Sequence, residues 1–424
     1  MTSPLWHPFT QHALMPEQVF IDRAEGAYLY DRSGKRIIDA ISSWWVNIHG
    51  HNHPKIVSAV QAQAAQLDQI IFAGFTHAPA EELAARLVAL TGPELTRVFF
   101  SDSGSTAVEV ALKMALGYWT HKGKARGGIV TLDHAYHGDT FGGMSVGGRS
   151  VFNAAYEPML FDVHRLPCPM PGAEHLTVEA FERLLQTQGD DMAALILEPL
   201  VLGAAGMLMY SPTTLRALYD LCQRYGVLFI ADEVMTGWGR TGTRFACDQA
   251  GITPDIVCLS KGLTGGYLPL AVTMASEEIY QAFYSPDRAK TFFHSSSFTG
   301  NPLACAAANA SLALWDEEPV MARIQTLHRQ QAALIPHLAA RPDVTNIRHT
   351  GTILAFDLRV DDPGYLSGIG PKLYRYFINH GILLRPLGET LYMLPPYCVT
   401  KDDLDVIVAT LDGALDALAH GELE

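Results

Sequence analysis

The chain has 424 residues, 48% hydrophobic and 17% charged, which is an ordinary globular balance. Its formal net charge of -14 at pH 7 repels phosphate backbones and anionic lipids, so no nucleic-acid or membrane partner is expected. The six cysteines are scattered without a CxxC pair, which predicts reduced thiols. The N-terminus shows no basic region followed by an apolar run, so no signal peptide is expected and a cytoplasmic protein is predicted.

Short strand patterns characterise the N-terminal segment, residues 1–60. AYLYD (27–31) and RIIDAISSWW (36–45) are separated by a Ser-Gly turn, a pattern that predicts a hairpin. Neighbouring side chains of a strand point to opposite faces, so Trp44 and Trp45 are expected to lie in different environments.

Helical patterns alternate with short apolar runs over residues 61–315. One helix is expected between Ser211, with a proline after it, and Gly226. The apolar runs are typical of strands buried on both faces, so a large domain with a mainly parallel sheet flanked by helices is predicted. These runs are RVFFSD (97–102), GGIVTLD (127–133), MAALILEPL (192–200), GVLFIADEV (226–234) and DIVCLSKG (255–262).

The C-terminal part, residues 316–424, resembles a separate α+β unit. A helix over 321–340 leads into RHTGTILAFDL (348–358), another helix, GILLRPL (381–387) and TLYMLPP (390–396). Neither this unit nor the N-terminal hairpin has enough apolar surface alone. We therefore predict an α/β fold in which a large domain is joined by a small α+β domain built from both termini.

Two charged residues end neighbouring buried strands. Asp232 alone could be a helix cap, and Lys261 alone could be a surface lysine. Ligands of such sheets bind at the carboxyl ends of the strands, and a helix-length connection separates these two residues. They are therefore expected at one sheet edge, close enough to share one ligand.

The same edge is expected to hold an anion site and an aromatic face. Ser103, Gly104 and Ser105 precede a helical pattern, whose first turn attracts anions, although a simple serine cap is the alternative. Tyr136 follows another strand. A ligand that matches these residues would have a phosphate, a flat ring that stacks on Tyr136, a ring nitrogen kept protonated by Asp232, and an aldehyde captured by Lys261. These features indicate pyridoxal 5′-phosphate (PLP).

Other catalytic patterns are weaker. His49, His51 and His53 alternate as metal ligands could, but they flank Gly and Pro without nearby carboxylates or thiols, so a structural turn is favoured and no metal is expected. No P-loop order and no GxSxG elbow occurs.

Several motifs resemble the class III (ω-amino) aminotransferases of PLP fold type I over nearly the whole chain. They are GHNHP, SGSTAVEVALKMA, AYHGDT, ADEVMTGWGRTG, LSKGLTGG and FTGNPLACAAA. WHPFT, SSWWVNIHGHNHP, THAPA and LLRPLG favour the branch that acts in biotin biosynthesis. That resemblance implies a homodimer that converts 8-amino-7-oxononanoate to 7,8-diaminononanoate, with S-adenosylmethionine as the amino donor.

The resemblance also implies roles for individual residues. Lys261 would bind the cofactor covalently, Asp232 its ring nitrogen, and Gly104 and Ser105 its phosphate. Tyr136 would stack near the ring and touch the substrate.

Further residues would bind substrate or reach a second subunit. Trp44 would line the substrate pocket, and Arg385 would bind the carboxylate of the keto acid. Phe9 replaces the family's tyrosine, so the aromatic face remains but the phenolic hydrogen bond to the donor is lost. Across the dimer, Ser295 would touch substrate, while Ser296 and Ser297 would reach the partner's cofactor phosphate.

Two departures separate the chain from glutamate-using relatives. Ala205 stands where those relatives carry an acid, and Met235 stands where many carry glutamine. Both argue against ornithine or 4-aminobutyrate as substrate. The alternatives that stay open are an ω-aminotransferase using a diamine or amino acid with pyruvate, the same acceptor with lysine as donor, and a PLP aminomutase.

Overall fold

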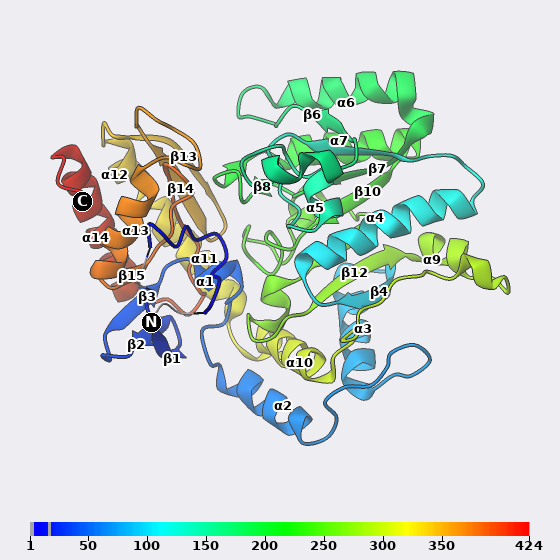
Figure 1. The fold of residues 1–424 in the computed structure, drawn as a ribbon, viewed down its shortest axis with the longest axis horizontal. Helices are drawn as coiled ribbons and strands as arrows, with labels where there is room; N and C mark the ends of the chain where they lie inside the picture. The colour runs from blue at the N-terminus through cyan, green and yellow to red at the C-terminus, as the bar shows by residue number, and fades with distance from the viewer. Residues whose placement is uncertain (1–3, 16–17, 424) are drawn as a thin grey trace.

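A seven-stranded sheet forms the centre of the computed structural model, which describes residues 4–15 and 18–423 (Figure 1). In spatial order its strands are β4 (Leu95–Ser101), β12 (Ala271–Ser276), β11 (Ile256–Leu259), β10 (Leu228–Asp232), β7 (Met192–Leu197), β5 (Gly128–Leu132) and β6 (His164–Leu166). All five predicted strands are present. Strand β12 was not predicted; it pairs antiparallel with both β4 and β11 inside an otherwise parallel sheet.

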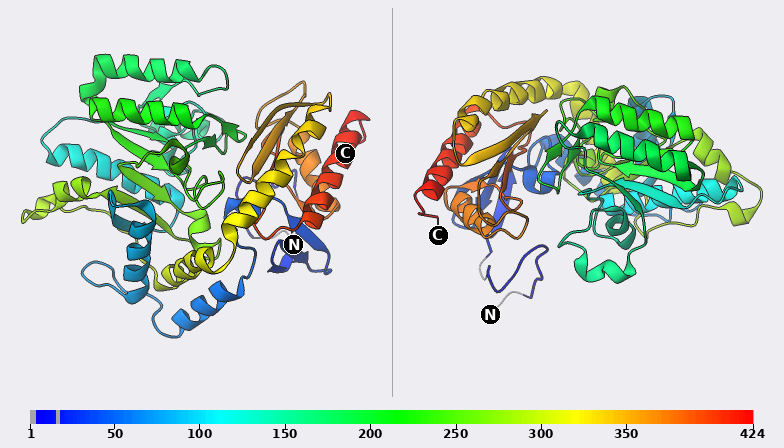
Figure 2. Two further views of the ribbon diagram at one scale, coloured as in Figure 1. Left: turned by 180° about the vertical axis from the view of Figure 1, so that it is seen from behind. Right: turned by 90° about the horizontal axis from the view of Figure 1, so that it is seen from above.

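Helices cover both faces of this sheet, as Figures 1 and 2 show. Alternate residues of β10 explain why: Ile230 packs in a cluster with Val108 of α4, whereas Phe229 packs with Leu215 of α7. Both strand faces are therefore apolar. The helices of this region are α2 (Pro54–Ala64), α3 (Ala78–Thr91), α4 (Gly104–His121), α5 (Phe141–Val146), α6 (Glu174–Gln188), α7 (Pro212–Tyr225), α8 (Cys247–Ala250), α9 (Glu277–Phe283) and α10 (Pro302–Glu317).

The boundaries of α7 confirm the prediction made from its flanking residues. The Ser211 side chain accepts a hydrogen bond from the backbone N–H of Thr214 at the start of the helix. Gly226 ends it in the left-handed conformation with φ 62°. The remaining short helices are 3₁₀ turns, η1 (Ala154–Met159), η2 (Gly189–Asp191), η3 (Lys261–Thr264) and η4 (Arg288–Lys290).

Segments from both termini build the smaller region, as predicted. One sheet has the order β1 (Ile21–Glu25), β2 (Tyr28–Asp31), β3 (Arg36–Asp39) and β15 (Ile382–Leu383), and the other β13 (Val344–Thr350), β14 (Ile353–Leu358) and β16 (Thr390–Met393). β15 pairs in parallel with β3, which joins the C-terminal segment to the N-terminal hairpin. The helices here are α11 (Val320–Ala332), α12 (Ile335–Ala339), α13 (Ile369–Asn379) and α14 (Lys401–Ala419). The domain limits at residues 60 and 315 stay a prediction.

The expectation of a strand through SSWW is wrong. β3 ends at Asp39, and residues 42–45 form the single turn α1 (Ser42–Trp45), in which Ser42, Ser43 and Trp45 have positive φ angles. The buried carboxylate of Asp39 accepts hydrogen bonds from the backbone N–H of Ser43, at 2.8 Å, and from its hydroxyl, at 2.9 Å. A side chain that binds the following backbone in this way favours a turn over a strand.

The three alternating histidines have separate structural partners. His49 is buried with Nε2 3.2 Å from Ser311 Oγ, and His51 Nε2 lies 2.9 Å from Asp39 Oδ2. His53 caps α2 and contacts Glu318. Over residues 4–15 and 18–423 no group of three His, Cys, Asp or Glu side chains could hold a metal ion. In the same ranges, no helix is both long and apolar enough to cross a membrane.

The contact of the β13–β14 turn with the large domain gives a stability prediction. A Cβ atom on Gly351 would overlap the backbone of Arg240 and Gly242, whereas one on Gly226 would meet nothing within 4 Å, although both glycines have positive φ. Gly226→Ala should cost about 1 kcal/mol from left-handed strain. Gly351→Ala should cost at least about 3 kcal/mol because backbone overlap adds to that strain. Thermal unfolding of the two variants compares these costs, and equal losses would contradict the packing at Gly351.

Candidate active site

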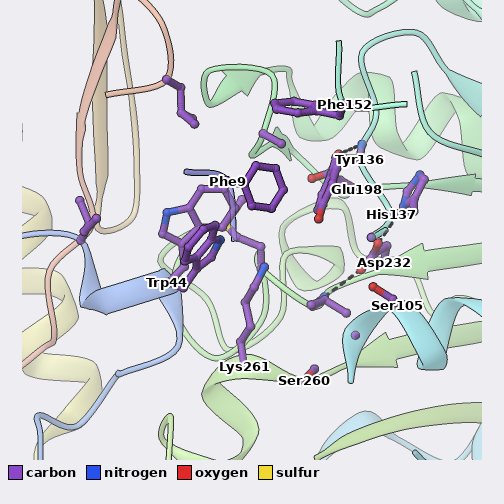
Figure 3. A pocket seen from close by; sticks show the side chains of 18 of the residues that line it. Phe9, Trp44, Ser105, Tyr136, His137, Phe152, Glu198, Asp232, Ser260 and Lys261 are labelled. Atoms are coloured by element: carbon purple, nitrogen blue, oxygen red, sulfur yellow. Dashed lines mark hydrogen bonds and ion pairs between the residues drawn. The ribbon is translucent and has the colours of Figure 1, made fainter. Parts of the chain in front are cut away.

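A cavity of about 260 Å³ opens at the carboxyl ends of β10 and β11 (Figure 3). Residues from the sheet, from α1 and from the loop after β15 line it. It therefore lies where both domains contribute walls, which is a common place for a ligand site in folds of this kind.

Eight of the eleven predicted site residues line this cavity. They are Phe9, Trp44, Gly104, Ser105, Tyr136, Asp232, Lys261 and Arg385. Ser295, Ser296 and Ser297 do not. They lie in the segment before α10, where Ser295 and Ser297 are exposed and the backbone N–H of Ser296 donates to Thr299 Oγ1 at 2.9 Å.

Asp232 is paired with a histidine that was not predicted as a site residue. Its Oδ2 lies 2.7 Å from His137 Nδ1, and its Oδ1 accepts from the backbone N–H of Val234 at 3.1 Å. His137 is buried, and its Nε2 has no hydrogen-bond partner among the described residues. His137 stands beside Tyr136 in the AYHGDT motif, which is the signal that could have identified it.

Lys261 follows β11 and points into the cavity (Figure 3). Burial lowers the pKa of its amine from 10.5 to about 8, although the nearby Asp232 and Glu198 carboxylates oppose this shift. Its Nζ lies 4.8 Å from the centre of the Trp45 ring. A neutral amine is thus accessible near physiological pH.

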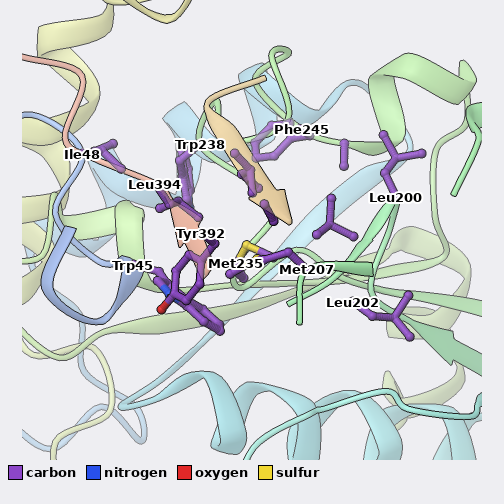
Figure 4. Packing of buried hydrophobic residues seen from close by; sticks show 14 of the residues in the cluster. Trp45, Ile48, Leu200, Leu202, Met207, Met235, Trp238, Phe245, Tyr392 and Leu394 are labelled. Carbon is purple, nitrogen blue, oxygen red and sulfur yellow. The ribbon is translucent and has the colours of Figure 1, made fainter. Parts of the chain in front are cut away.

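Trp45 belongs to the core and to the cavity wall together. Trp45 is 7% exposed and its ring packs against Tyr392, in a cluster that also contains Met235 (Figure 4), and its Nε1 donates to Tyr392 Oη at 3.0 Å. The two tryptophans were expected to lie in different environments, and although their burial differs, both line the cavity. Trp44, 46% exposed, lines the cavity from the same turn.

Glu198, at the end of β7, is a second buried acid that was not predicted as a site residue. Its carboxylate accepts from the backbone N–H groups of Tyr136 and Gly203, both at 3.0 Å. Burial raises the pKa of this carboxyl from 4.5 to about 7. Glu198 therefore holds two loops of the cavity wall together, and its position in the conspicuous Glu-Pro element of MAALILEPL was the available signal.

The start of α4 fits a phosphate group. Ser103 caps the helix, and Gly104 and Ser105 of its first turn line the cavity. A Cβ on Gly104 would lie 2.7 Å from Val234 Cγ1, which requires glycine there. With the amine of Lys261 and the carboxylate of Asp232 at the same cavity, these residues match the phosphate, aldehyde and ring nitrogen of PLP.

Aromatic rings form the outer part of the cavity (Figure 3), and Arg385 also lines it. The centre of the Phe9 ring lies 5.6 Å from the centre of the Trp44 ring and 5.8 Å from the centre of the Phe152 ring. Arg385 Nη2 donates to the backbone oxygen of Phe9 at 2.9 Å, and its guanidinium lies 5.2 Å from the Trp44 ring centre. This arrangement offers an apolar channel with one cation.

Comparison with known proteins agrees with this geometry. The model of the class-III aminotransferase family matches residues 10–415. The adenosylmethionine-8-amino-7-oxononanoate aminotransferase of Synechococcus elongatus is 51% identical over 98% of this chain and 99% of its own. Its namesake from Nitratidesulfovibrio vulgaris is 42% identical over 98% of this chain and 81% of its own.

Solved structures show the same fold. The enzyme of that name from Methanocaldococcus jannaschii superposes with a TM-score of 0.93 at 34% identity, over 97% of both chains. An amine transaminase from an uncultivated Pseudomonas species, in its PLP-bound form, gives 0.89 at 32% identity, over 98% of both chains. The chain belongs to the class-III aminotransferases.

The lowered pKa of Lys261 predicts its reactivity in cofactor-free protein. An amine reacts in its neutral form, so reductive methylation of Lys261 should rise through its pKa of about 8 and level off by about pH 9. Lys401, whose pKa is raised by its surface pairing with Asp405, should keep gaining rate above that pH. Mass spectrometry of the two labelled peptides measures both profiles. Parallel profiles would contradict the burial of the Lys261 amine.

Proposed function

We propose that this chain transfers an amino group to 8-amino-7-oxononanoate, forming 7,8-diaminononanoate, with PLP as cofactor and S-adenosylmethionine as donor. The observation that carries the proposal is the 51% identity, over nearly the full length of both chains, to a relative named for this reaction. The cavity supports it, because Trp44, Phe9 and Arg385 line it together with Lys261.

PLP, when bound, supplies an electron sink that allows an amino group to be removed from one substrate and added to another. We assign its phosphate to Gly104 and Ser105, its ring face to Tyr136 and its aldehyde to Lys261. The Asp232 carboxylate would keep a proton on the ring nitrogen, and the His137 contact at 2.7 Å orients that carboxylate.

Lys261 acts as the base of the reaction. With PLP bound, Lys261 would hold its aldehyde, and the Nζ would be the group placed to take a proton from a donor's amine-bearing carbon, or to give one to the acceptor carbon that receives nitrogen. A pKa of about 8 suits this exchange, because a base works best when its pKa is near the working pH.

The outer cavity suits a long amino acid with a distant carboxylate. Trp44 and Phe9 provide apolar walls for a methylene chain, and each buried CH₂ contributes about 0.8 kcal/mol. Arg385 can bind the far carboxylate through two hydrogen bonds. In the structure its Nη2 donates to Phe9 O, so carboxylate binding and the position of the N-terminal segment are linked.

We also propose that the active protein is a homodimer. Ser295, Ser296 and Ser297 lie outside the cavity of their own chain, and Phe293 and Phe298 of the same segment are 71% and 60% exposed. Exposed phenylalanines beside polar residues favour a protein interface. In a dimer these serines would reach the partner's cavity, with Ser296 and Ser297 on the phosphate and Ser295 on substrate.

The second candidate is an ω-aminotransferase that uses pyruvate. It is favoured by structural neighbours such as the ω-transaminase of Pseudomonas jessenii, with a TM-score of 0.92 at 28% identity. The relatives named for 8-amino-7-oxononanoate have 51% and 42% identity to this chain, which is higher than the 28% of this ω-transaminase. The oxononanoate is therefore preferred as the acceptor.

A spectrum of the purified protein tests the proposed function. The bound cofactor should absorb at about 420 nm. S-adenosylmethionine should bleach this band, and 8-amino-7-oxononanoate should restore it. Bleaching by lysine alone would reassign the donor, and restoration by pyruvate alone would favour the second candidate.

Substitutions of the two tryptophans of α1 should have contrasting effects on activity and stability. Trp44→Ala should lower kcat/KM about tenfold or more, because it removes apolar wall worth at least about 1.4 kcal/mol, and should barely change the melting temperature. Trp45→Ala should lower stability by about 3–5 kcal/mol, since a buried ring and its hydrogen bond are lost. Steady-state kinetics and thermal unfolding of both variants give the comparison. A larger stability loss for Trp44→Ala would mean that the assignments are reversed.

A further inference from the structure

We propose that Arg348 is a positioning residue that sets the shape of the substrate cavity by fastening the 203–207 loop to the small domain. The inference rests on the proposed function, because it concerns the same substrate cavity. The loop joins β8 (Val201–Leu202) to β9 (Leu208–Met209), a short antiparallel hairpin that follows β7.

The 203–207 loop forms a wall shared by two spaces. Ala204 lines the cavity that contains Lys261 and also an adjoining chamber of about 350 Å³. Ala205 and Gly206 line that chamber too, and Phe152 and Tyr365 border both spaces. A displacement of this loop would therefore change the room available to a substrate beyond its reacting carbon.

Arg348, from β13, provides the hydrogen bonds that fix the tip of this loop. Its Nε donates to the backbone oxygens of Gly206 and Met207, both at 3.0 Å, and its Nη2 also donates to Gly206 O. The same Nη2 lies 2.7 Å from Asp357 Oδ1. The guanidinium thus bridges a loop of the large domain and a carboxylate of the small domain.

The surroundings hold this guanidinium in one place. Asp357 Oδ1 also accepts from Thr390 Oγ1 at 2.7 Å, and Asp357 Oδ2 accepts from Asn346 Nδ2 at 3.1 Å. The Arg348 side chain is only 12% exposed. A Cβ on Gly206 would lie 2.8 Å from Thr390 Oγ1, so the loop approaches the small-domain sheet closely.

The two ends of the loop are secured in different ways. Gly203 donates to the buried Glu198, and Met207 is fully buried in the cluster shown in Figure 4. Between these anchors Ala204 and Ala205 have short side chains that can contribute little packing. The hydrogen bonds from Arg348 to the backbone oxygens of Gly206 and Met207 therefore provide a polar link between this stretch and the small domain.

Arg341 provides a matched control. It is also a half-buried arginine of the small domain, 18% exposed, with Nε 3.1 Å from Asp343 Oδ1 and Nη1 2.8 Å from Asp416 Oδ1. Both of its partners belong to the small domain, and it lines neither space. Removing it deletes comparable ion pairs without touching the 203–207 loop.

The test compares Arg348→Met, Arg348→Lys and Arg341→Met in the holoenzyme by steady-state kinetics and by hydrogen exchange. Arg348→Met should raise KM for 8-amino-7-oxononanoate about tenfold, as expected from losing hydrogen bonds made by a charged group, and change kcat less than about threefold. Amides of residues 203–209 should exchange faster. Arg348→Lys should be intermediate, because one ammonium cannot reproduce the forked contacts. Arg341→Met should leave KM and this exchange unchanged.

An unchanged KM or an unchanged exchange rate in Arg348→Met would overturn the inference, as would equal effects in Arg341→Met. If Arg348→Met does not fold, Arg348→Lys is judged by the same two criteria. If the wild-type enzyme accepts pyruvate and not the oxononanoate, the proposed function is wrong, and the KM ratio is measured with pyruvate. The exchange measurement does not depend on the substrate, so the two failures are distinguishable.

Discussion

The burial of ionisable groups at the ends of three parallel strands is the constraint on which this structure depends. Asp232, Glu198 and Lys261 end or follow β10, β7 and β11, where they line one cavity and the two acids are buried. Isolated charges in such a place are costly, so each needs a partner. His137 and the backbone N–H groups of the cavity loops supply partners for the acids, and thereby fix those loops. Burial lowers the pKa of the Lys261 amine by more than the carboxylates of Asp232 and Glu198 raise it, so the pKa falls.

Much of the site could be predicted because its residues end long apolar runs. Strands buried on both faces are readable from sequence, and their carboxyl ends meet at one edge, so the sequence alone predicts that Asp232 and Lys261 lie together. His137 and Glu198 were missed because their importance arises from contacts between distant segments. The SSWW turn was missed because a buried Asp39, and not local strand propensity, sets its backbone. The strand β12 has an apolar run like those of its neighbours, but its antiparallel direction depends on pairing with β4 and β11, which are distant in the sequence from each other. Ser295, Ser296 and Ser297 follow no predicted strand end, and they lie outside the cavity of their own chain.

Different parts of the chain provide the inner and outer parts of the cavity. The large domain provides the residues that match the cofactor, whose requirements are shared by the whole class. The turn at Trp44, the N-terminal segment with Phe9 and the loop with Arg385 provide the outer wall. Differences between members of the class can accumulate in these segments, because changing them leaves the ends of β7, β10 and β11 intact.

The parallel pairing of β15 with β3 has a consequence for synthesis of the chain. Ile382 lies opposite Ile38 and Leu383 opposite Asp39, so the strand before Trp44 finds this neighbour only when the C-terminal segment has been made. During translation the seven-stranded sheet can form early, with Asp232 and Lys261 already in place. Its outer wall stays open until Arg385 and β16 emerge. The cavity thus gains the part of its wall that contains Arg385 and Tyr392 only after the C-terminal segment has been made, and this segment completes the enclosure of Lys261.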